Sequence, residues 1–250
     1  MSYQVLNYHR FLFQWHCRNF FRFRRYLSGA EKDYLETCFA LAQGFEEVSE
    51  SGYSHFSYYS YSHRVDGELV NSSRLAYGSV CHPGPAWQAA RPVLAERSLT
   101  LPDFFVNNPV SNFYGLGWDL LERQFKVYFR VTQLTQLPAE VATLIGPRRL
   151  EDHREEGLVS YTYVDNQLSE TKVYLYPRLS VELPEGVRGE AYMMTDRRGT
   201  VPQYDVASSA SWIDKINPAG QGIVRLYQEL DETLDTIAYT DPDHYTLYFP

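Results

Sequence analysis

Cysteine is scarce in this sequence. Three cysteines, Cys17, Cys38 and Cys81, occur in 250 residues, with no CxxC pair and no spacing typical of a zinc site. A disulfide framework is therefore not expected, and we predict a reducing cytoplasm as the compartment. The sequence also lacks an uninterrupted run of about 20 apolar residues, so no membrane span is predicted. Its first 26 residues lack the apolar core of a signal peptide.

An excess of basic residues is missing as well. The sequence has 31 Asp and Glu against 23 Lys and Arg, which gives a formal net charge of −8. Nucleic acids attract proteins through basic surfaces, so we do not expect a nucleic-acid partner. The Walker A, GxGxxG and GxSxG signatures are also absent, so nothing in the sequence indicates nucleotide binding or serine hydrolase chemistry.

Aromatic residues, by contrast, are abundant. The chain contains 21 Tyr and 14 Phe. A tyrosine side chain is apolar on the faces of its ring and carries a hydrogen-bonding hydroxyl at its tip. The excess of tyrosine therefore suits a half-polar cavity as well as it suits a hydrophobic core.

The sequence pattern predicts hairpins separated by helices within a single domain, 1–250. A basic amphipathic helix is expected within residues 1–28, and further helices over residues 30–48, 85–97, 138–144 and 211–236, the last interrupted at Pro218-Ala219-Gly220. Residues 99–113 are expected to form a loop. Hairpin turns are expected at Asp66-Gly67, Glu122-Arg123, Asn166-Gln167 and Arg198-Gly199, before a final strand over residues 244–250.

This order of elements predicts the fold class. Consecutive hairpins favour antiparallel pairing. Helices that recur between hairpins can all cover the same face of the sheet, and the other face is then most simply buried by closing the sheet. We therefore predict an α+β fold, an antiparallel β-barrel of repeated αββα units with the helices outside.

The stretch "FKVYFR", residues 125–130, alternates as a strand does. Lys126, Tyr128 and Arg130 fall on one face, and the other face is apolar. An ordinary solvated face would carry Ser, Thr or Glu rather than two cations around an aromatic ring. Three other stretches alternate similarly: Lys172, Tyr174 and Tyr176 share a face of "TKVYLYP", Tyr161 and Tyr163 share a face of "SYTYVD", and Arg74 lies in "ELVNSSRLAY".

Two interpretations of the basic faces remain open. If the apolar faces pack on the helices, the closed sheet has a lumen lined by Arg74, Lys126, Arg130 and Lys172. Burying these cations is unfavourable unless an anion neutralises them, so this interpretation predicts an anionic ligand. The alternative is an open sheet with the Lys and Tyr face in water, because Lys and Arg are common on solvated faces and Tyr is a good strand former.

Short motifs in a fixed order resemble a known family. The strand "GLGWDL", residues 115–120, turns into "KVYFR", residues 126–130, and "ELVNSSRL", residues 68–75, provides a first-hairpin strand with an Arg. The stretches "AYMMTD" and "VPQYDV" and a closing "YTLYF" follow. In this order, over residues 30–250, the chain resembles the ABBA-fold aromatic prenyltransferases, most closely the cyanobactin (ribosomal peptide) branch.

The resemblance implies a prenyltransferase that moves an allylic group from a prenyl diphosphate, such as dimethylallyl diphosphate, to an aromatic or peptide side chain. The chemistry allows Mg²⁺ as a cofactor that assists the leaving group. Carried over by position, the resemblance assigns diphosphate binding to Arg74, Lys126, Arg130 and Lys172, shielding of the allylic cation to Tyr128, Tyr174 and Tyr176, and the prenyl or acceptor pocket to Tyr161, Tyr163 and Tyr248. There is no DDxxD cluster for helical isoprenoid synthase chemistry, and "DPD" at residues 241–243 is predicted to be a turn.

One part of the family pattern is missing. Members that prenylate oxygen or an aromatic ring usually carry a Glu base near the start of the first barrel strand, where this chain has Ser60 or its neighbours. His63 is the candidate base on that strand, or else a simple hairpin residue. Two other functions therefore stay open: a noncatalytic barrel that binds a small amphipathic anion or pigment, and a plain α+β interaction protein.

Overall fold

The computed structural model describes the strands of the chain and several of its helices. The described residues are 57–79, 87, 90–91, 94–95, 99–107, 111–119, 122–146, 153–177, 189–196, 199–206, 210–229 and 233–249. The helices expected within residues 1–28 and over residues 30–48 lie outside them and stay predictions. Within the helix expected over residues 85–97, the described positions are helical.

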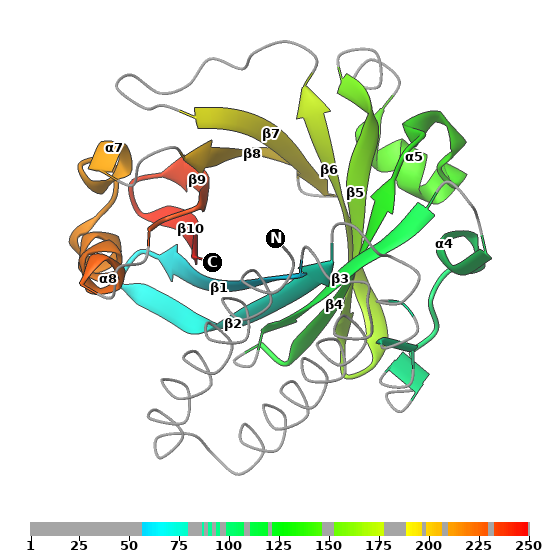
Figure 1. The fold of residues 1–250 in the computed structure, drawn as a ribbon, viewed down its shortest axis with the longest axis horizontal. Coiled ribbons are helices and arrows are strands. Elements are labelled where there is room, and N and C mark those ends of the chain that lie inside the picture. The colour runs from blue at the N-terminus through cyan, green and yellow to red at the C-terminus, as the bar shows by residue number, and fades with distance from the viewer. Residues whose placement is uncertain are drawn as a thin grey trace, which may run out of the picture.

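Ten described strands form the centre of the molecule, and each hydrogen-bonded pair is antiparallel. Their order is β1-β10-β9-β8-β7-β6-β5-β4-β3-β2, and because β2 also pairs with β1, the order closes into a barrel (Figure 1). The predicted mixed α+β fold with antiparallel hairpins is confirmed. The strands are β1 (Ser57–Asp66), β2 (Leu69–Ser79), β3 (Ser111–Asp119), β4 (Gln124–Val131), β5 (His153–Val164), β6 (Gln167–Pro177), β7 (Gly189–Asp196), β8 (Gly199–Val206), β9 (Thr236–Asp241) and β10 (His244–Phe249).

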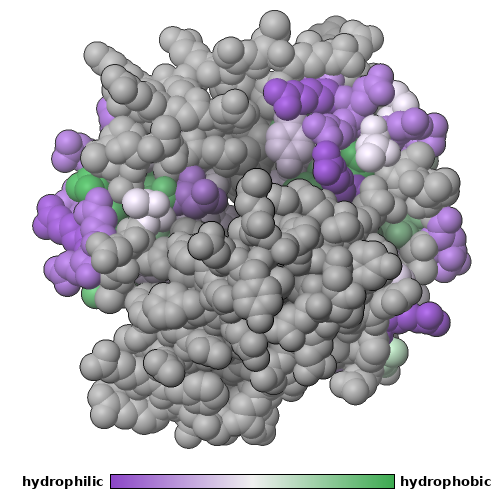
Figure 2. All heavy atoms as spheres, viewed as in Figure 1, coloured by the Kyte–Doolittle hydropathy of each residue, from purple (hydrophilic) through white to green (hydrophobic). Residues whose placement is uncertain are grey.

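The described helices lie outside the ring of strands, in two groups on opposite sides (Figure 1). Hydrophilic side chains cover the outer surface of the C-terminal group at the left of Figure 2, as expected for a helix that buries only its inner side. None of the described helices has the length and apolar character needed to cross a lipid bilayer. The helices are α4 (Asp103–Asn107), α5 (Ala139–Ile145), α7 (Ala210–Ile213) and α8 (Pro218–Gln228), with a 3₁₀ helix, η3 (Leu134–Gln136).

The outward faces of the strands form the hydrophobic core. Val127 of β4 is fully buried and pairs in register with Leu116 of β3 and Tyr161 of β5, which are also buried. These residues belong to a cluster that includes residues of α4 and α5. A second cluster joins β1, β9 and β10 to α7 and α8, where Trp212 and Val224 are fully buried. Where the side chains are described, the helices therefore bury the apolar faces of β1, β3, β4, β5, β6, β9 and β10 and leave the other faces to the interior of the barrel.

The C-terminal part differs from the prediction in two elements. The sequence predicts a helix break at Pro218-Ala219-Gly220, but these residues form the first turn of α8, because proline fits the first turn of a helix. Asn217 caps this helix by accepting a 3.2 Å hydrogen bond from the backbone N–H of Gly220. The predicted helix through residue 236 is also wrong, because β9 begins at Thr236 and pairs with β10. The predicted turn at "DPD" is confirmed between these two strands.

Two smaller differences concern turns and loops. The β5–β6 turn lies at Asp165-Asn166, one residue earlier than predicted, where φ is 47° and 64°. Asp and Asn tolerate positive φ better than most residues, so they suit this tight turn. Helix α4 lies in the region that the sequence predicts as loop over residues 99–113.

Gly220→Ala tests how α8 packs on β10. A Cβ at Gly220 would collide with the Tyr245 hydroxyl, which donates a 2.7 Å hydrogen bond to Asn217 Oδ1. Alanine normally stabilises a helix relative to glycine by about 1 kcal/mol. Here we expect displacement of Tyr245 to lower the free energy of unfolding by roughly 1–3 kcal/mol, measured by urea denaturation.

The matched control for this substitution is Gly222→Ala in the same helix. A Cβ at Gly222 meets no atom within 4 Å. We expect this variant to be as stable as the native protein or more stable by up to about 1 kcal/mol. Equal effects of the two substitutions would contradict the packing of Gly220 against Tyr245.

Candidate functional site

The inner faces of β1, β2, β3, β4, β6, β9 and β10 surround a cavity of about 510 Å³. This volume is typical of small-molecule sites. Asp66, Glu122 and His244, which lie beside three hairpin turns, contribute to its wall, so the cavity extends to the hairpin end of the barrel. The backbone N–H of Gly67 donates a 2.8 Å hydrogen bond to the carbonyl of Asp243, which brings the β1–β2 and β9–β10 turns together.

Alternation along β4 orders the side chains that enter the cavity. Gln124, Lys126 and Tyr128 line it in sequence from the hairpin end, and successive inward residues of a strand are about 7 Å apart. Gly117 of β3 is the register partner of Lys126. A Cβ at Gly117 would lie 3.1 Å from the ring of Tyr128. The glycine in "GLGWDL" therefore leaves the space that the Tyr128 ring occupies.

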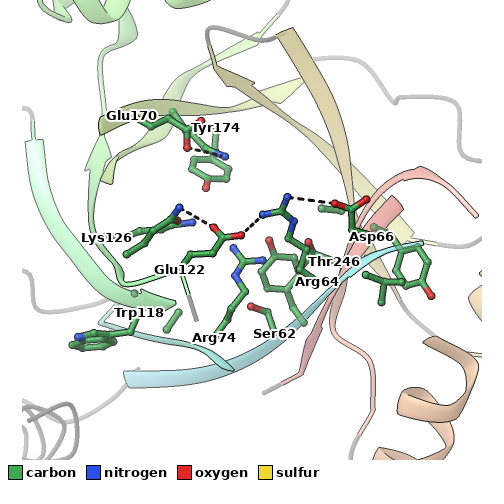
Figure 3. A pocket seen from close by; sticks show the side chains of 18 of the residues that line it. Ser62, Arg64, Asp66, Arg74, Trp118, Glu122, Lys126, Glu170, Tyr174 and Thr246 are labelled. Atoms are coloured by element: carbon green, nitrogen blue, oxygen red, sulfur yellow. Dashed lines mark hydrogen bonds and ion pairs between the residues drawn. The ribbon is translucent and has the colours of Figure 1, made fainter. Parts of the chain in front are cut away.

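Among the described residues, four Lys and Arg side chains line the cavity, and a carboxylate partners three of them. Figure 3 shows the pair of Arg64 with Glu122. Lys126 differs because it forms no ion pair with a described residue, although it is only 8% exposed. An anion that enters the cavity would therefore meet one cation whose charge is not yet compensated. The three pairs are Arg64 Nη1 with Glu122 Oε1 at 2.7 Å, Arg74 Nε with Asp119 Oδ2 at 3.2 Å, and Lys172 Nζ with Glu170 Oε2 at 3.1 Å.

The environment of Lys126 lowers its pKa to about 7. Burial is the main cause, and the positive charges of Arg74 and Lys172 add to it, while Asp119 and Glu170 act in the opposite direction. Lys126 therefore loses part of its positive charge near neutral pH. A bound anion would favour the charged form, so the cavity gains its full positive charge only when it is occupied.

Tyr128, Tyr174 and Tyr248 of the predicted site line the same cavity, together with Tyr245. The ring centroids of Tyr128 and Tyr174 are 6.3 Å apart at an interplanar angle of 47°, and a hydrogen bond joins the two side chains. Burial raises the pKa of Tyr128 to about 12 and that of Tyr174 well above its ordinary value. Both hydroxyls stay neutral, so the rings present aromatic faces rather than negative charge beside the cations.

The cavity brings together only part of the predicted site: Arg74, Lys126, Lys172, Tyr128, Tyr174 and Tyr248. Arg130 and Tyr176 come next along β4 and β6, beyond the inward tyrosines, and the structure does not bring them to the cavity wall. Arg130 Nη2 instead lies 2.7 Å from Glu156 Oε2, and these side chains are 42% and 38% exposed. The sequence therefore predicts the inward faces of β4 and β6 correctly. The cavity wall, however, ends at Tyr128 and Tyr174, one inward residue before Arg130 and Tyr176.

The prediction that Tyr161 and Tyr163 line the acceptor pocket is wrong. Both are 2% exposed and belong to the core between the barrel and the helices. Their register partners in β4 are Val127 and Phe125, and antiparallel partners point to the same side of a sheet. The inward positions of β5 are therefore the residues between the tyrosines, such as Thr162, which pairs with Lys126.

The prediction that His63 is a catalytic base is also wrong. Its Nε2 lies 2.9 Å from the hydroxyl of Tyr227 on α8, and its ring packs at 5.7 Å on that of Phe249. Its neighbours in the chain, Ser62 and Arg64, line the cavity, whereas His63 lies on the opposite face of β1. Burial lowers the pKa of His63 to about 4, so the imidazole stays neutral at pH 7.

The carboxylates of the site have no role in the sequence predictions. Asp119 could have been found, because it lies in "GLGWDL" on the same alternating face as Gly117. Its side chain is 2% exposed and contacts Arg74. Glu170 could have been found in the same way, because it lies in β6 two residues before Lys172, on the same face. Glu122 lies in the β3–β4 turn, where no alternation indicates the direction of a side chain.

The described residues include no group of three His, Cys, Asp or Glu side chains that could hold a metal ion. The cavity carboxylates Asp66, Glu122 and Glu170 each form an ion pair with Arg64 or Lys172. The donor set of the described residues therefore does not fit a protein-bound Mg²⁺, and no step of the chemistry below passes through one.

Comparison with known proteins adds no assignment. No protein-family model matches the chain. No curated protein matches it either. The function is therefore inferred from the cavity and its residues.

We expect anion binding to weaken as the pH rises above about 7. Lys126 is positively charged below its pKa of about 7 and neutral above it. The affinity for inorganic pyrophosphate should therefore fall by up to about tenfold per pH unit on the alkaline side. Isothermal titration calorimetry between about pH 6 and about pH 9 measures this dependence.

The control for this experiment is Lys126→Arg, which keeps its charge throughout that range. Any pH dependence that it retains belongs to other groups, including the ionisation of pyrophosphate itself. Wild-type and Lys126→Arg profiles that run parallel would contradict the assignment to Lys126.

Proposed function

We propose that the protein is a prenyltransferase with an αββα-type barrel. It would bind a prenyl diphosphate in the cavity and transfer the prenyl group to an aromatic or peptide side chain. The observation that carries this proposal is the presence of Arg74, Lys126 and Lys172 in the wall of one cavity, together with Tyr128 and Tyr174. The resemblance of the strand motifs to the aromatic prenyltransferases also supports prenyl transfer as the function.

The three cations suit a ligand with several anionic oxygens. Arg74, Lys126 and Lys172 come from β2, β4 and β6, so they approach the cavity from different parts of its wall. Lys and Arg bind phosphate oxygens through charge-assisted hydrogen bonds, which are stronger than neutral ones. Lys126 supplies a cation without a carboxylate partner among the described residues, and a diphosphate would provide the missing negative charge.

The tyrosines suit the other half of the substrate. In the proposed reaction, the bond between the allylic carbon and a diphosphate oxygen breaks, and its electron pair goes to that oxygen. The cations stabilise the departing diphosphate. The faces of Tyr128 and Tyr174 stabilise the positive allylic group and exclude water. The acceptor then forms a bond to the allylic carbon, and its proton passes to the diphosphate.

This route assigns proton transfer to the leaving group rather than to a histidine, in keeping with the position of His63 outside the cavity. Any Mg²⁺ would be carried by the diphosphate, and the proposal assigns no protein ligand to it. A second candidate function, binding of a small amphipathic anion without transfer, is favoured by one observation. The cavity carboxylates Asp66, Glu122 and Glu170 are held in ion pairs, so none is poised as a base.

Lys126→Ala and Lys172→Ala test the diphosphate site. We expect dimethylallyl diphosphate to raise the melting temperature of the native protein. Because a hydrogen bond between charged groups contributes about 1.5–3 kcal/mol, each substitution should weaken binding roughly 10- to 100-fold and remove most of this thermal shift. Arg130→Ala is the control, because Arg130 pairs with Glu156 outside the cavity and should leave the shift intact. An undiminished shift in both lysine variants would contradict the site.

Transfer is tested separately from binding. The native protein is incubated with dimethylallyl or geranyl diphosphate and a panel of peptides and indoles, and products are detected by mass spectrometry and pyrophosphate release. We expect a prenylated product with at least one acceptor. Thermal stabilisation without any product would favour the noncatalytic binding function, and the absence of both would favour an interaction protein.

A further inference from the structure

Asp119 is a buried carboxylate with an unusually complete set of contacts. Its side chain is 2% exposed. Asn71 Nδ2 donates hydrogen bonds of 2.9 and 3.1 Å to its two oxygens, and the backbone N–H of Glu122 donates one of 3.0 Å to Oδ1. Asp119 Oδ2 also lies 3.2 Å from Arg74 Nε. A carboxylate held from β2 and from the β3–β4 turn has little freedom to move.

Arg74 is the group that this carboxylate contacts on the cavity side. Its side chain is 16% exposed and extends from β2 into the cavity (Figure 3). The contact with Asp119 uses Nε, and no described residue forms a further hydrogen bond or ion pair with the guanidinium. The terminal nitrogens Nη1 and Nη2 therefore remain available as a parallel pair of donors for an oxyanion.

We propose that Asp119 is a positioning residue: fixed by Asn71, it holds Arg74 by Nε so that Nη1 and Nη2 bind the anionic group of the ligand. This inference rests on the proposed function, because it concerns the diphosphate end of the same cavity. It extends that function by assigning a role to a residue that does not itself bind the ligand.

A purely structural role for Asp119 predicts a different result. The hydrogen bond from Glu122 shows that Asp119 also shapes the β3–β4 turn. If this were its whole contribution, Asp119→Asn would alter stability. It would also remove a negative charge from the surroundings of the ligand, so anion affinity would stay equal or increase. A positioning role predicts the opposite, because Arg74 would lose the contact that orients it.

The test measures binding of inorganic pyrophosphate to Asp119→Asn by calorimetry at about pH 6. This pH lies below the pKa of Lys126, about 7, so Lys126 is mostly charged, which limits the effect of losing Asp119, a group that helps to raise that pKa. We expect affinity to fall roughly 10- to 100-fold, as for the loss of hydrogen bonds between charged groups. Equal or tighter binding by Asp119→Asn would overturn the proposal.

A double-mutant comparison assigns the effect to Arg74. In an Arg74→Ala background, Asp119→Asn should cause no further loss of affinity, because the residue that it positions is absent. A loss of the same size in both backgrounds would overturn the proposal. If the native protein does not bind pyrophosphate or dimethylallyl diphosphate at all, the proposed function fails instead, which separates the two conclusions.

A second variant covers the case in which Asp119→Asn does not fold. Asn71 holds Asp119 but does not line the cavity. Asn71→Ala should keep the fold, as judged by circular dichroism, and should weaken pyrophosphate binding severalfold through the loosened carboxylate. A folded Asn71→Ala variant with native affinity would count against the positioning role.

Discussion

The antiparallel register between β3, β4 and β5 is the constraint on which both the core and the site depend. Lys126 faces the cavity, and its register partners are Gly117 and Thr162. Its neighbour Val127 faces the helices, together with Leu116 and Tyr161. A slip of one residue would exchange the two faces, burying the cation under the helices and exposing apolar side chains to the cavity. The same backbone hydrogen bonds therefore specify the hydrophobic core and the charged interior.

The sequence predicts this arrangement well where the two faces of a strand differ in chemistry. In β4 and β6, basic and apolar residues alternate, so the inward face is unambiguous. In β5 the alternation is between Ser or Thr and Tyr, and both kinds of residue occur on either side of a sheet. Burial of Tyr161 and Tyr163 in the core was not predictable from β5 alone. It follows from the apolar partners that β4 presents to them.

Two contacts of the site, the Arg64–Glu122 ion pair and the Asn71–Asp119 hydrogen bond, could not be predicted in the same way, because they join distant segments. Arg64 and Glu122 are 58 positions apart, and Asn71 and Asp119 are 48 apart. Only the pairing of β2 with β3 brings the first two hairpins together. His63 is a similar case, since its partner Tyr227 is 164 positions away on α8. A sequence motif indicates the chemistry of a side chain. Its contact partners depend on which strands and helices become neighbours in the fold.

The position of the hairpin turns divides the cavity into two parts with different freedom to change. Lys126 and Tyr128 lie within paired strands, where a substitution disturbs both the register and the core. Asp66, Glu122 and His244 lie beside turns, and turns tolerate substitution and insertion better than paired strands do. Substitutions at the rim of this barrel can therefore change what enters the cavity while the cations of its interior keep their positions.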